Sequence, residues 1–359
     1  CEIPSGAAAD LWGRKRCMIL SNLCIAVSCV IMLFSKSFGW FAVSFAVQAL
    51  GNNLNSGSEE ALVYDSMKCL GQEEHYMGVY GRLNVLIEVA QGLATVAGGV
   101  LAEFSYFWCY AACVVIAVLA LLPVLGMAEP PQCSKAADTA GGSAKDAPAE
   151  GTPAQRTIWE TVKHHFAVSA CILQKDARIG KIIGFYSVVF AAHTLLFFYS
   201  QQYFADFGYN KVQISVIMLL VGGASCLGAL ASAKMYRRFG KRCLIPETVI
   251  IAAAILCYGS GKAGVAAAAL MCAGFANAAL YPIQSDSLNA LIPSEQRATL
   301  ISVDSMCFSI AMIVLFPLAG AFADRWGLKT VLLLLGAILL LFLLAAFCIE
   351  KESFSSDHS

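Results

Sequence analysis

Runs of about twenty apolar residues recur along almost the whole chain, and they constrain the fold more than any other feature. A helix of that length crosses roughly 30 Å of hydrocarbon with its backbone groups hydrogen-bonded internally. Only 13% of the 359 residues are charged, and the mean hydropathy is +0.69, whereas an ordinary soluble domain has about a quarter charged residues. The sequence therefore predicts an all-α, polytopic membrane protein.

Ten complete spans are expected, separated by short polar turns except at one long break. The expected spans are 17–35, 38–57, 79–101, 107–127, 182–203, 214–235, 243–261, 265–283, 300–322 and 330–348. We expect them to form an N-terminal helical bundle at 1–127 and a C-terminal bundle at 182–349, with a linker region at 128–181 and a tail at 350–359.

The long break is rich in Pro, Gly, Ala, Ser and charged residues over 129–155. Such a composition cannot bury a core, so we expect a flexible linker there. After it, Ile158, Val162 and Phe166 recur on one helical face while Glu160 and Lys163 fall off that face. This spacing predicts an amphipathic helix that lies on the membrane surface.

Basic residues are distributed unevenly between the two sides that alternating spans define. Most of the 24 Lys and Arg residues fall on the side that carries the linker. Because loops that stay in the cytoplasm retain Lys and Arg, we expect the linker and the C-terminus to be cytoplasmic in a multi-pass protein of the cell membrane. The formal net charge of +0 adds nothing about partners, and no nucleic-acid partner is expected.

The 15 cysteines sit mostly inside apolar spans, and no C-x-x-C pair occurs. Neither a zinc site nor a redox pair is therefore indicated, and the cysteines are interpreted as small apolar packing residues. No metal and no cofactor is expected.

The chain contains an internal repeat. A constant shift places Asp65 on Asp286, Ser66 on Ser287 and, without a gap, Glu103 on Asp324. In this register the first half is short by one whole helix and most of another. The sequence therefore predicts two pseudo-symmetric helical bundles, with about ten complete transmembrane helices present of twelve.

The opening turn resembles the signature G-x-x-x-D-[RK]-x-G-R-[RK] of the major facilitator superfamily. The matching residues are Gly6, Asp10, Gly13, Arg14 and Lys15. Leu11 departs from the pattern, which has a cation there. A degraded copy, "AKMYRRFGKR", stands at 233–242, where the repeat requires it, with Arg237 in place of the acid. The resemblance covers essentially the whole chain and implies the major facilitator fold of bacterial members, lacking helix 1 and most of helix 2.

The resemblance also implies a cytoplasmic gate. Asp10 would meet the start of the helix near 298–300, because a helix N-terminus favours an anion, and this contact would close the cytoplasmic mouth. The remaining gate candidates are Arg14, Glu59, Asp65, Arg82, Asp286 and Arg297. The alternative is that the cations at 14–16 only determine topology.

Ionisable groups at membrane depth cost about 2.5 to 3.5 kcal/mol on insertion scales, so each needs a reason. Glu88, His193 and Asp304 lie inside expected spans. A carboxyl group holds its proton in a dry cavity and releases it when water enters, so these three are candidates for proton coupling. The alternative is a satisfied hydrogen bond between helices.

Uncharged polar residues inside the spans are candidates for binding a solute at the interface between the bundles. These residues are Gln48, Asn52, Asn84, Gln91, Tyr199, Asn277, Tyr281 and Gln284. Polar contacts between helices are the alternative. Ala94 and Thr95 stand where many drug–proton antiporters of the family have Gly-Pro, which argues against a drug as the solute.

The expected function is secondary active transport of a small organic solute by alternating access, as proton-coupled efflux by a monomer in the lipid bilayer. Two alternatives are a truncated, non-transporting fragment of such a transporter and a membrane-embedded enzyme. The sequence contains no H-E-x-x-H, no G-x-S-x-G and no phosphate-binding loop, so an enzyme is not expected.

Overall fold

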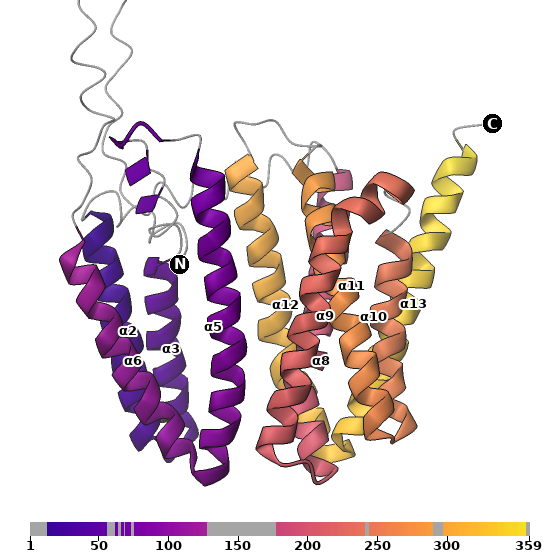
Figure 1. Ribbon diagram of the computed structural model, residues 1–359. Coiled ribbons are helices and arrows are strands. Elements are labelled where there is room, and N and C mark those ends of the chain that lie inside the picture. The colour runs from indigo at the N-terminus through magenta and orange to yellow at the C-terminus, as the bar shows by residue number, and fades with distance from the viewer. Residues whose placement is uncertain are drawn as a thin grey trace, which may run out of the picture. The chain divides into compact units, whose positions relative to one another are not determined.

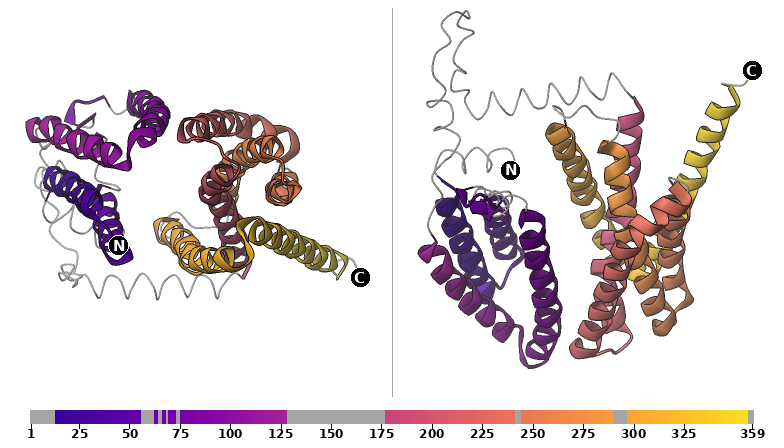
Figure 2. Two further views of the ribbon diagram at one scale, coloured as in Figure 1. Left: turned by 90° about the horizontal axis from the view of Figure 1, so that it is seen from below. Right: turned by 45° about the horizontal axis from the view of Figure 1, so that its top comes forward.

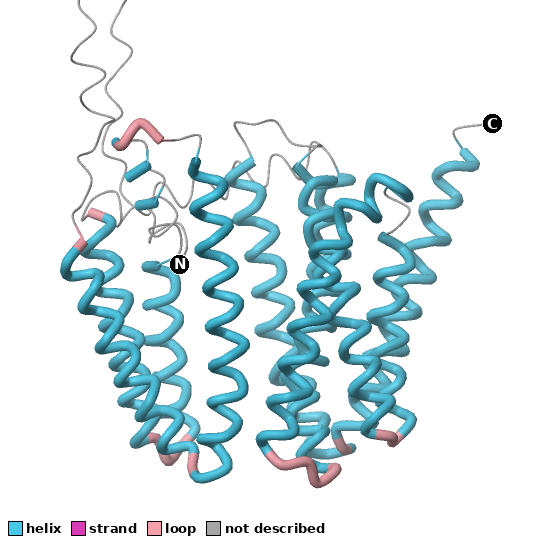
Figure 3. Tube along the Cα trace, viewed as in Figure 1, coloured by secondary structure: helices cyan, strands magenta, loops and turns pink. Residues whose placement is uncertain are grey.

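The computed structural model describes residues 13–55, 62–63, 66–67, 69–72, 75–127, 177–240, 244–289 and 297–356. These residues form helices and short turns, without a strand among them (Figures 1 and 3). The predicted all-α class is therefore confirmed. The chain divides into two compact units, Cys1–Phe166 and Ala167–Ser359.

Unit 1 contains four described helices. They are α2 (Arg14–Phe34), α3 (Phe38–Asn55), α5 (Tyr76–Phe104) and α6 (Tyr106–Gly126). Unit 2 contains the others, namely α8 (Ala177–Asp206), α9 (Lys211–Phe239), α10 (Leu244–Cys257), the short 3₁₀ helix η3 (Tyr258–Ser260), α11 (Ala263–Asn289), α12 (Arg297–Trp326) and α13 (Leu328–Ser356). Each expected span overlaps one of these helices.

Seven helical segments of the described chain are long and apolar enough to cross a membrane. They are Arg14–Phe34, Leu86–Phe104, Tyr106–Gly126, Ile179–Asp206, Lys211–Phe239, Ala263–Ser285 and Val303–Trp326, and two shorter apolar helices, Leu244–Ser260 and Leu328–Leu344, accompany them. The protein is therefore a multi-pass membrane protein. The predicted surface helix lies, up to residue 176, outside the described residues, and the proposed domain boundaries stay a prediction.

Within unit 1, α2 packs against both α3 and α6. A Cβ added to Gly51 of α3 would lie 3.0 Å from the carbonyl oxygen of Ser21, so only glycine fits this crossing comfortably. Near the other end of the same pair, Ser28 and Ser44 each donate a hydroxyl hydrogen bond to the other's backbone carbonyl, at 3.0 and 2.8 Å. In a bilayer the hydrophobic effect does not drive helices together, because lipid tails are as apolar as the side chains. Helices therefore associate through small residues, which allow close packing, and through hydrogen bonds between them.

Within unit 2, α8 lies between α11 and α12, as the view from below shows (Figure 2). The core is built from side chains of α8, α9, α10, α11 and α13. Helices α9 and α11 cross closely, and a Cβ on Gly228 would overlap the backbone carbonyl of Phe275. A Cβ on Gly274 would lie 2.8 Å from the Ser225 hydroxyl. Glycine on both helices therefore sets the distance between them.

Candidate transport site and gate residues

The gate candidates are only partly described. Gly6, Asp10, Glu59 and Asp65 lie outside the described residues. Asp286 belongs to α11 and Arg297 begins α12, but the placement of both side chains also lies outside the description. Gly13, Arg14, Lys15 and Arg82 are described, with Arg82 exposed on α5. The predicted contact of Asp10 with α12 stays a prediction.

The glycine of the opening turn has a backbone shape that explains its residue type. Gly13 precedes α2 with φ 91° and ψ 146°. In the degraded copy of the turn, Gly240 follows α9 with φ 58° and ψ −146°. Both lie in a region of φ/ψ space that almost only glycine occupies. The two copies of the motif therefore share a glycine-dependent bend.

Lys15 has a partner that the sequence did not predict. Its Nζ donates a hydrogen bond of 2.8 Å to the carbonyl oxygen of Leu125, in the last turn of α6. Carbonyl groups at a helix C-terminus lack partners within the helix and carry partial negative charge, so a cation is favourable there. One cation of the motif therefore caps a helix of its own unit. The two residues are 110 positions apart, and no local signal links them.

Candidates on α3 and α5 lie on the surface of unit 1. Asn52, Glu88 and Gln91 are exposed, and Gln48 is half-buried. The side chain of Asn84 lies outside the described residues. Among the described helices of this unit, α5 packs against α6, which leaves the polar positions on its membrane-spanning part uncovered within the unit.

On α11 the predicted cavity residues Asn277, Tyr281 and Gln284 are spaced four and three residues apart, so they share one helical face. Gln284 is 1% exposed, and neither atom of its side-chain amide has a hydrogen-bond partner. The Oδ1 atom of Asn277 is also buried without a partner. Tyr281, by contrast, is 59% exposed.

Helix α8 faces these residues. The rings of Phe190 and Tyr281 pack with their centroids 5.7 Å apart. His193 lies about one turn after Phe190 on α8, and Asn277 lies about one turn before Tyr281 on α11. Because the two helices run in opposite directions, these two residues lie at a similar depth. The Nε2 atom of His193 is buried without a partner. Unit 2 therefore brings His193 close in depth to the polar face of α11.

Asp304 is half-buried on α12. Its carboxylate and the Gln284 amide are close enough to interact electrostatically, although the amide completes no hydrogen bond. The predicted proton-coupling candidate on α12 and a predicted cavity residue on α11 are thus neighbours. The structure does not test which role either one has.

Tyr199 uses its hydroxyl to hold helices together. The hydroxyl donates a 3.1 Å hydrogen bond to the carbonyl of Phe316 on α12, and the two rings stack with centroids 5.6 Å apart. A Cβ on Gly320 would lie 3.0 Å from the same hydroxyl oxygen. This geometry favours the alternative interpretation for Tyr199, a polar contact between helices.

A buried carboxyl group that the sequence analysis did not single out lies on α10. Glu247 is 1% exposed, and both of its carboxyl oxygens lack a hydrogen-bond partner. The signal was available, because Glu247 is an acid inside the apolar run predicted at 243–261. Ser187 of α8, also missed, is buried with an unpartnered hydroxyl.

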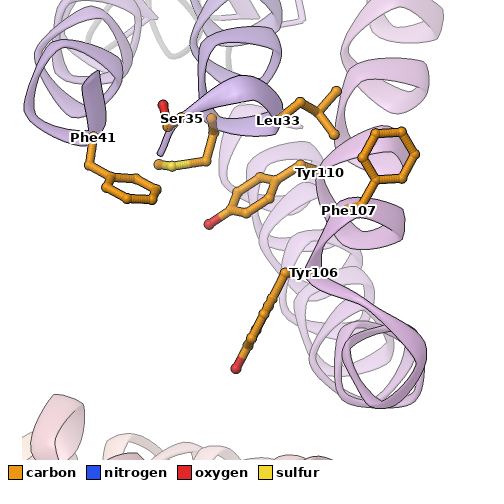
Figure 4. Close-up of a pocket in the computed structure, with 7 residues that line it drawn as sticks. Leu33, Ser35, Phe41, Tyr106, Phe107 and Tyr110 are labelled. Carbon is orange, nitrogen blue, oxygen red and sulfur yellow. The ribbon is translucent and has the colours of Figure 1, made fainter. Parts of the chain in front are cut away.

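Unit 1 contains a cavity of about 370 Å³ at the end where α2 stops and α3 and α6 begin (Figure 4). Its lining is apolar and aromatic, and its polar side-chain groups are the hydroxyls of one serine and two tyrosines. The lining residues are Met32, Leu33, Ser35, Phe41, Tyr106, Phe107 and Tyr110. None of the predicted site residues lines this cavity. Across the described part of the chain, no group of three or more His, Cys, Asp or Glu residues is placed to hold a metal ion.

The apolar spans define a helical membrane protein with several unpartnered polar atoms inside those spans. A family model described as Major Facilitator Superfamily matches residues 1–303 and 248–357. The chain therefore belongs to the major facilitator superfamily. This family makes it a secondary transporter by class, rather than an enzyme.

Solved structures of transporters share the fold. A mutant of the nucleoside transporter NupG superposes with a TM-score of 0.74 at 13% sequence identity, over 97% of this chain and 86% of that one. A D-xylose–proton symporter gives a TM-score of 0.65 at 14% identity, over 93% and 82%. A peptide transporter POT mutant gives 0.64 at 15% identity, over 98% and 83%. At such identities the likeness shows the fold alone. No curated protein matches the chain.

Proposed function

We propose that the protein moves a small organic solute across the cell membrane by alternating access, as proton-coupled efflux by a monomer. The observation that carries the proposal is the set of unpartnered polar atoms of His193, Asn277 and Gln284 inside membrane-spanning helices. An unsatisfied polar group in a membrane interior costs several kcal/mol. A solute that hydrogen-bonds these atoms would offset this cost.

In this proposal, Glu88 of α5 is the first candidate to exchange the coupled proton. It is an exposed carboxylate on the Leu86–Phe104 segment, which is long and apolar enough to span a membrane. His193 and Asp304 are the second and third candidates. The linker and the C-terminus are proposed to be cytoplasmic, and the residues of the opening turn are proposed to close the mouth on that side.

The test is solute flux in proteoliposomes with an imposed pH gradient. The first panel consists of a nucleoside, D-xylose and a dipeptide, chosen because the similar structures are a nucleoside transporter, a D-xylose–proton symporter and a peptide transporter. We expect flux of at least one solute to depend on the gradient, and we expect Glu88→Gln to remove that dependence. Asp206→Asn, which also neutralises an exposed acid of a described helix, is the matched control and should keep the dependence on the pH gradient.

Gradient-dependent flux that survives unchanged in Glu88→Gln would exclude this residue as the proton carrier. Flux that responds to a sodium gradient and ignores the pH gradient would exclude proton coupling altogether. Correctly folded protein that moves no solute in a broad panel would contradict the proposed function.

A further inference from the structure

The polar face of α11 combines two kinds of recognition element. Tyr281 presents an exposed aromatic ring, which packs against Phe190 of α8. Gln284 lies three residues further on, so its amide stands one turn from that ring on the same face. An aromatic surface and an amide at this separation can contact the plane and the edge of one flat molecule.

The Gln284 amide restricts what that edge can be. Neither its Nε2 nor its Oε1 atom makes a well-formed hydrogen bond, although the Asp304 carboxylate of α12 interacts with the amide. The amide nitrogen carries two N–H groups, so one can face Asp304 while the other, beside Oε1, offers an adjacent donor and acceptor. The complement of an amide is a group that presents an adjacent acceptor and donor, as planar nitrogen heterocycles do. Glutamine and asparagine pair in this bidentate way with adenine edges in nucleic-acid complexes.

The charges of unit 2 argue against an anionic solute. Between Lys181 and Lys211 no Lys or Arg occurs on α8, and none occurs on α11. On α12 the only cations are Arg297 and Arg325, at its two ends. A carboxylate or phosphate placed beside Tyr281 would therefore have no cationic partner on α8, α11 or α12 at membrane depth, where an unpaired charge is costly. The Asp304 carboxylate, which interacts with Gln284, would also repel it.

We propose, building on the proposed transport function, that this face binds a planar nitrogen heterocycle of the nucleobase type that carries no negative charge. Gln284 pairs with the donor–acceptor edge of the heterocycle, and the ring stacks on Tyr281. Asn277, one turn further along the face, accepts a hydrogen bond from a polar substituent on the solute. Gln284 is covered in this conformation, so the proposal requires a second conformation in which the solute reaches the amide.

The test is equilibrium binding of tritiated uridine and tritiated adenosine to the purified full chain in lipid nanodiscs. We expect at least one of the two to bind. For uridine, 3-methyluridine should compete at least tenfold more weakly than unlabelled uridine, because the methyl group removes the N3–H donor and leaves the amide unpaired. D-xylose, a dipeptide and tetraphenylphosphonium should not compete.

Two variants separate pairing from stacking. Gln284→Leu should bind uridine at least tenfold more weakly and should no longer distinguish it from 3-methyluridine. Tyr281→Ala should weaken all heterocycles, whereas Tyr281→Phe should keep their affinity because it keeps the ring. Gln202→Leu is the matched control, because Gln202 bonds to Asp206 at the far end of α8, and it should bind as the parent chain does.

Binding and flux of the sugar, the dipeptide or the cation, without binding of either nucleoside, would overturn this inference and leave the transport function standing. Nucleoside binding that Gln284→Leu leaves unchanged would also overturn it. Folded protein that neither binds nor moves any of these solutes would overturn both.

Discussion

At the scale of single residues, the side chains that matter most are polar groups with one well-defined partner or with none. Lys15 and Tyr258 belong to the first kind, and Gln284, Asn277 and Glu247 to the second. A partnered group stabilises one conformation. An unpartnered buried group instead indicates that a ligand, or a second conformation, supplies its hydrogen-bond partner.

Replacing Lys15 by Met should lower the free energy of unfolding by about 0.3 to 1 kcal/mol, the usual range for a cation at a helix C-terminus. The melting temperature should fall accordingly. The cause is the loss of the bond from Nζ to the Leu125 carbonyl. Differential scanning fluorimetry of the purified protein measures the change. Arg16 is an exposed neighbour in the same turn, and Arg16→Met should leave the melting temperature unaltered. Lys15→Arg keeps the positive charge and should retain most of the parent's melting temperature.

Among the described residues of unit 2, Tyr258 is the largest fully buried side chain. Its hydroxyl lies 2.6 Å from the Ser200 hydroxyl, and its backbone carbonyl accepts a 2.9 Å bond from Tyr203. Tyr258→Phe removes only the first bond and should cost about 1 kcal/mol. Chemical denaturation followed by tryptophan fluorescence measures it. Tyr236→Phe, outside this network, is the control, and equal stability of Tyr258→Phe and the parent would contradict a contribution from the hydroxyl.

At the scale of elements, glycine decides how closely helices approach. Gly228 of α9 faces the backbone of Phe275 on α11, whereas Gly222 and Gly223 of the same helix face open space. The three residues have the same helix propensity, so their substitution separates packing from propensity.

Gly228→Val should therefore be destabilising by several kcal/mol or should prevent folding, because backbone atoms cannot move aside as a flexible side chain can. Gly222→Val should change stability by less than about 1 kcal/mol. Size-exclusion profiles and melting temperatures of the two variants are the measurement. A folded Gly228→Val protein with the parent's melting temperature would show that α9 and α11 are further apart than described.

The helices themselves were predictable from sequence, because a twenty-residue apolar run has one stable solution in a bilayer. Their ends were less so. The predicted span 243–261 is an α-helix only to Cys257 and continues as a 3₁₀ turn, Tyr258–Ser260, that Gly261 closes with φ 68°. Local turn chemistry decides such ends, and hydropathy does not report it.

The candidate site was predictable in part. A polar residue within an apolar span stands out, which is why Asn277, Tyr281 and Gln284 were found. The bond between Lys15 and Leu125 was not predictable, because it depends on which helices become neighbours. Tyr199 illustrates the same point, since only the path of α12 shows that its hydroxyl is already bonded.

At the scale of the whole molecule, the testable property is orientation in the membrane. The distribution of Lys and Arg predicts that the linker is cytoplasmic and that the turn between α8 and α9 is outside. A cysteine introduced at Gly141 should therefore resist a membrane-impermeant maleimide in intact cells. A cysteine introduced at Phe207, which is 44% exposed in that turn, should react.

Mass spectrometry of the labelled protein measures both positions against the parent chain, whose native cysteines give the background. After the cells are permeabilised, both positions should react. Ready labelling of position 141 in intact cells, with protection of position 207, would reverse the proposed topology and with it the side on which the gate would close.

The bends at Gly13 and Gly240 have a consequence for engineering. The two motif copies have diverged in side chains, since an arginine replaced the acid in the second, yet each retains a glycine in the same strained region of backbone space. The acidic side chain and the glycine bend of the motif can therefore occur independently of each other. An aspartate introduced at Arg237, in the last turn of α9, would stand three residues before Gly240, the same spacing as that of Asp10 before Gly13. This variant would restore the acid of the motif at a position where the glycine bend already exists.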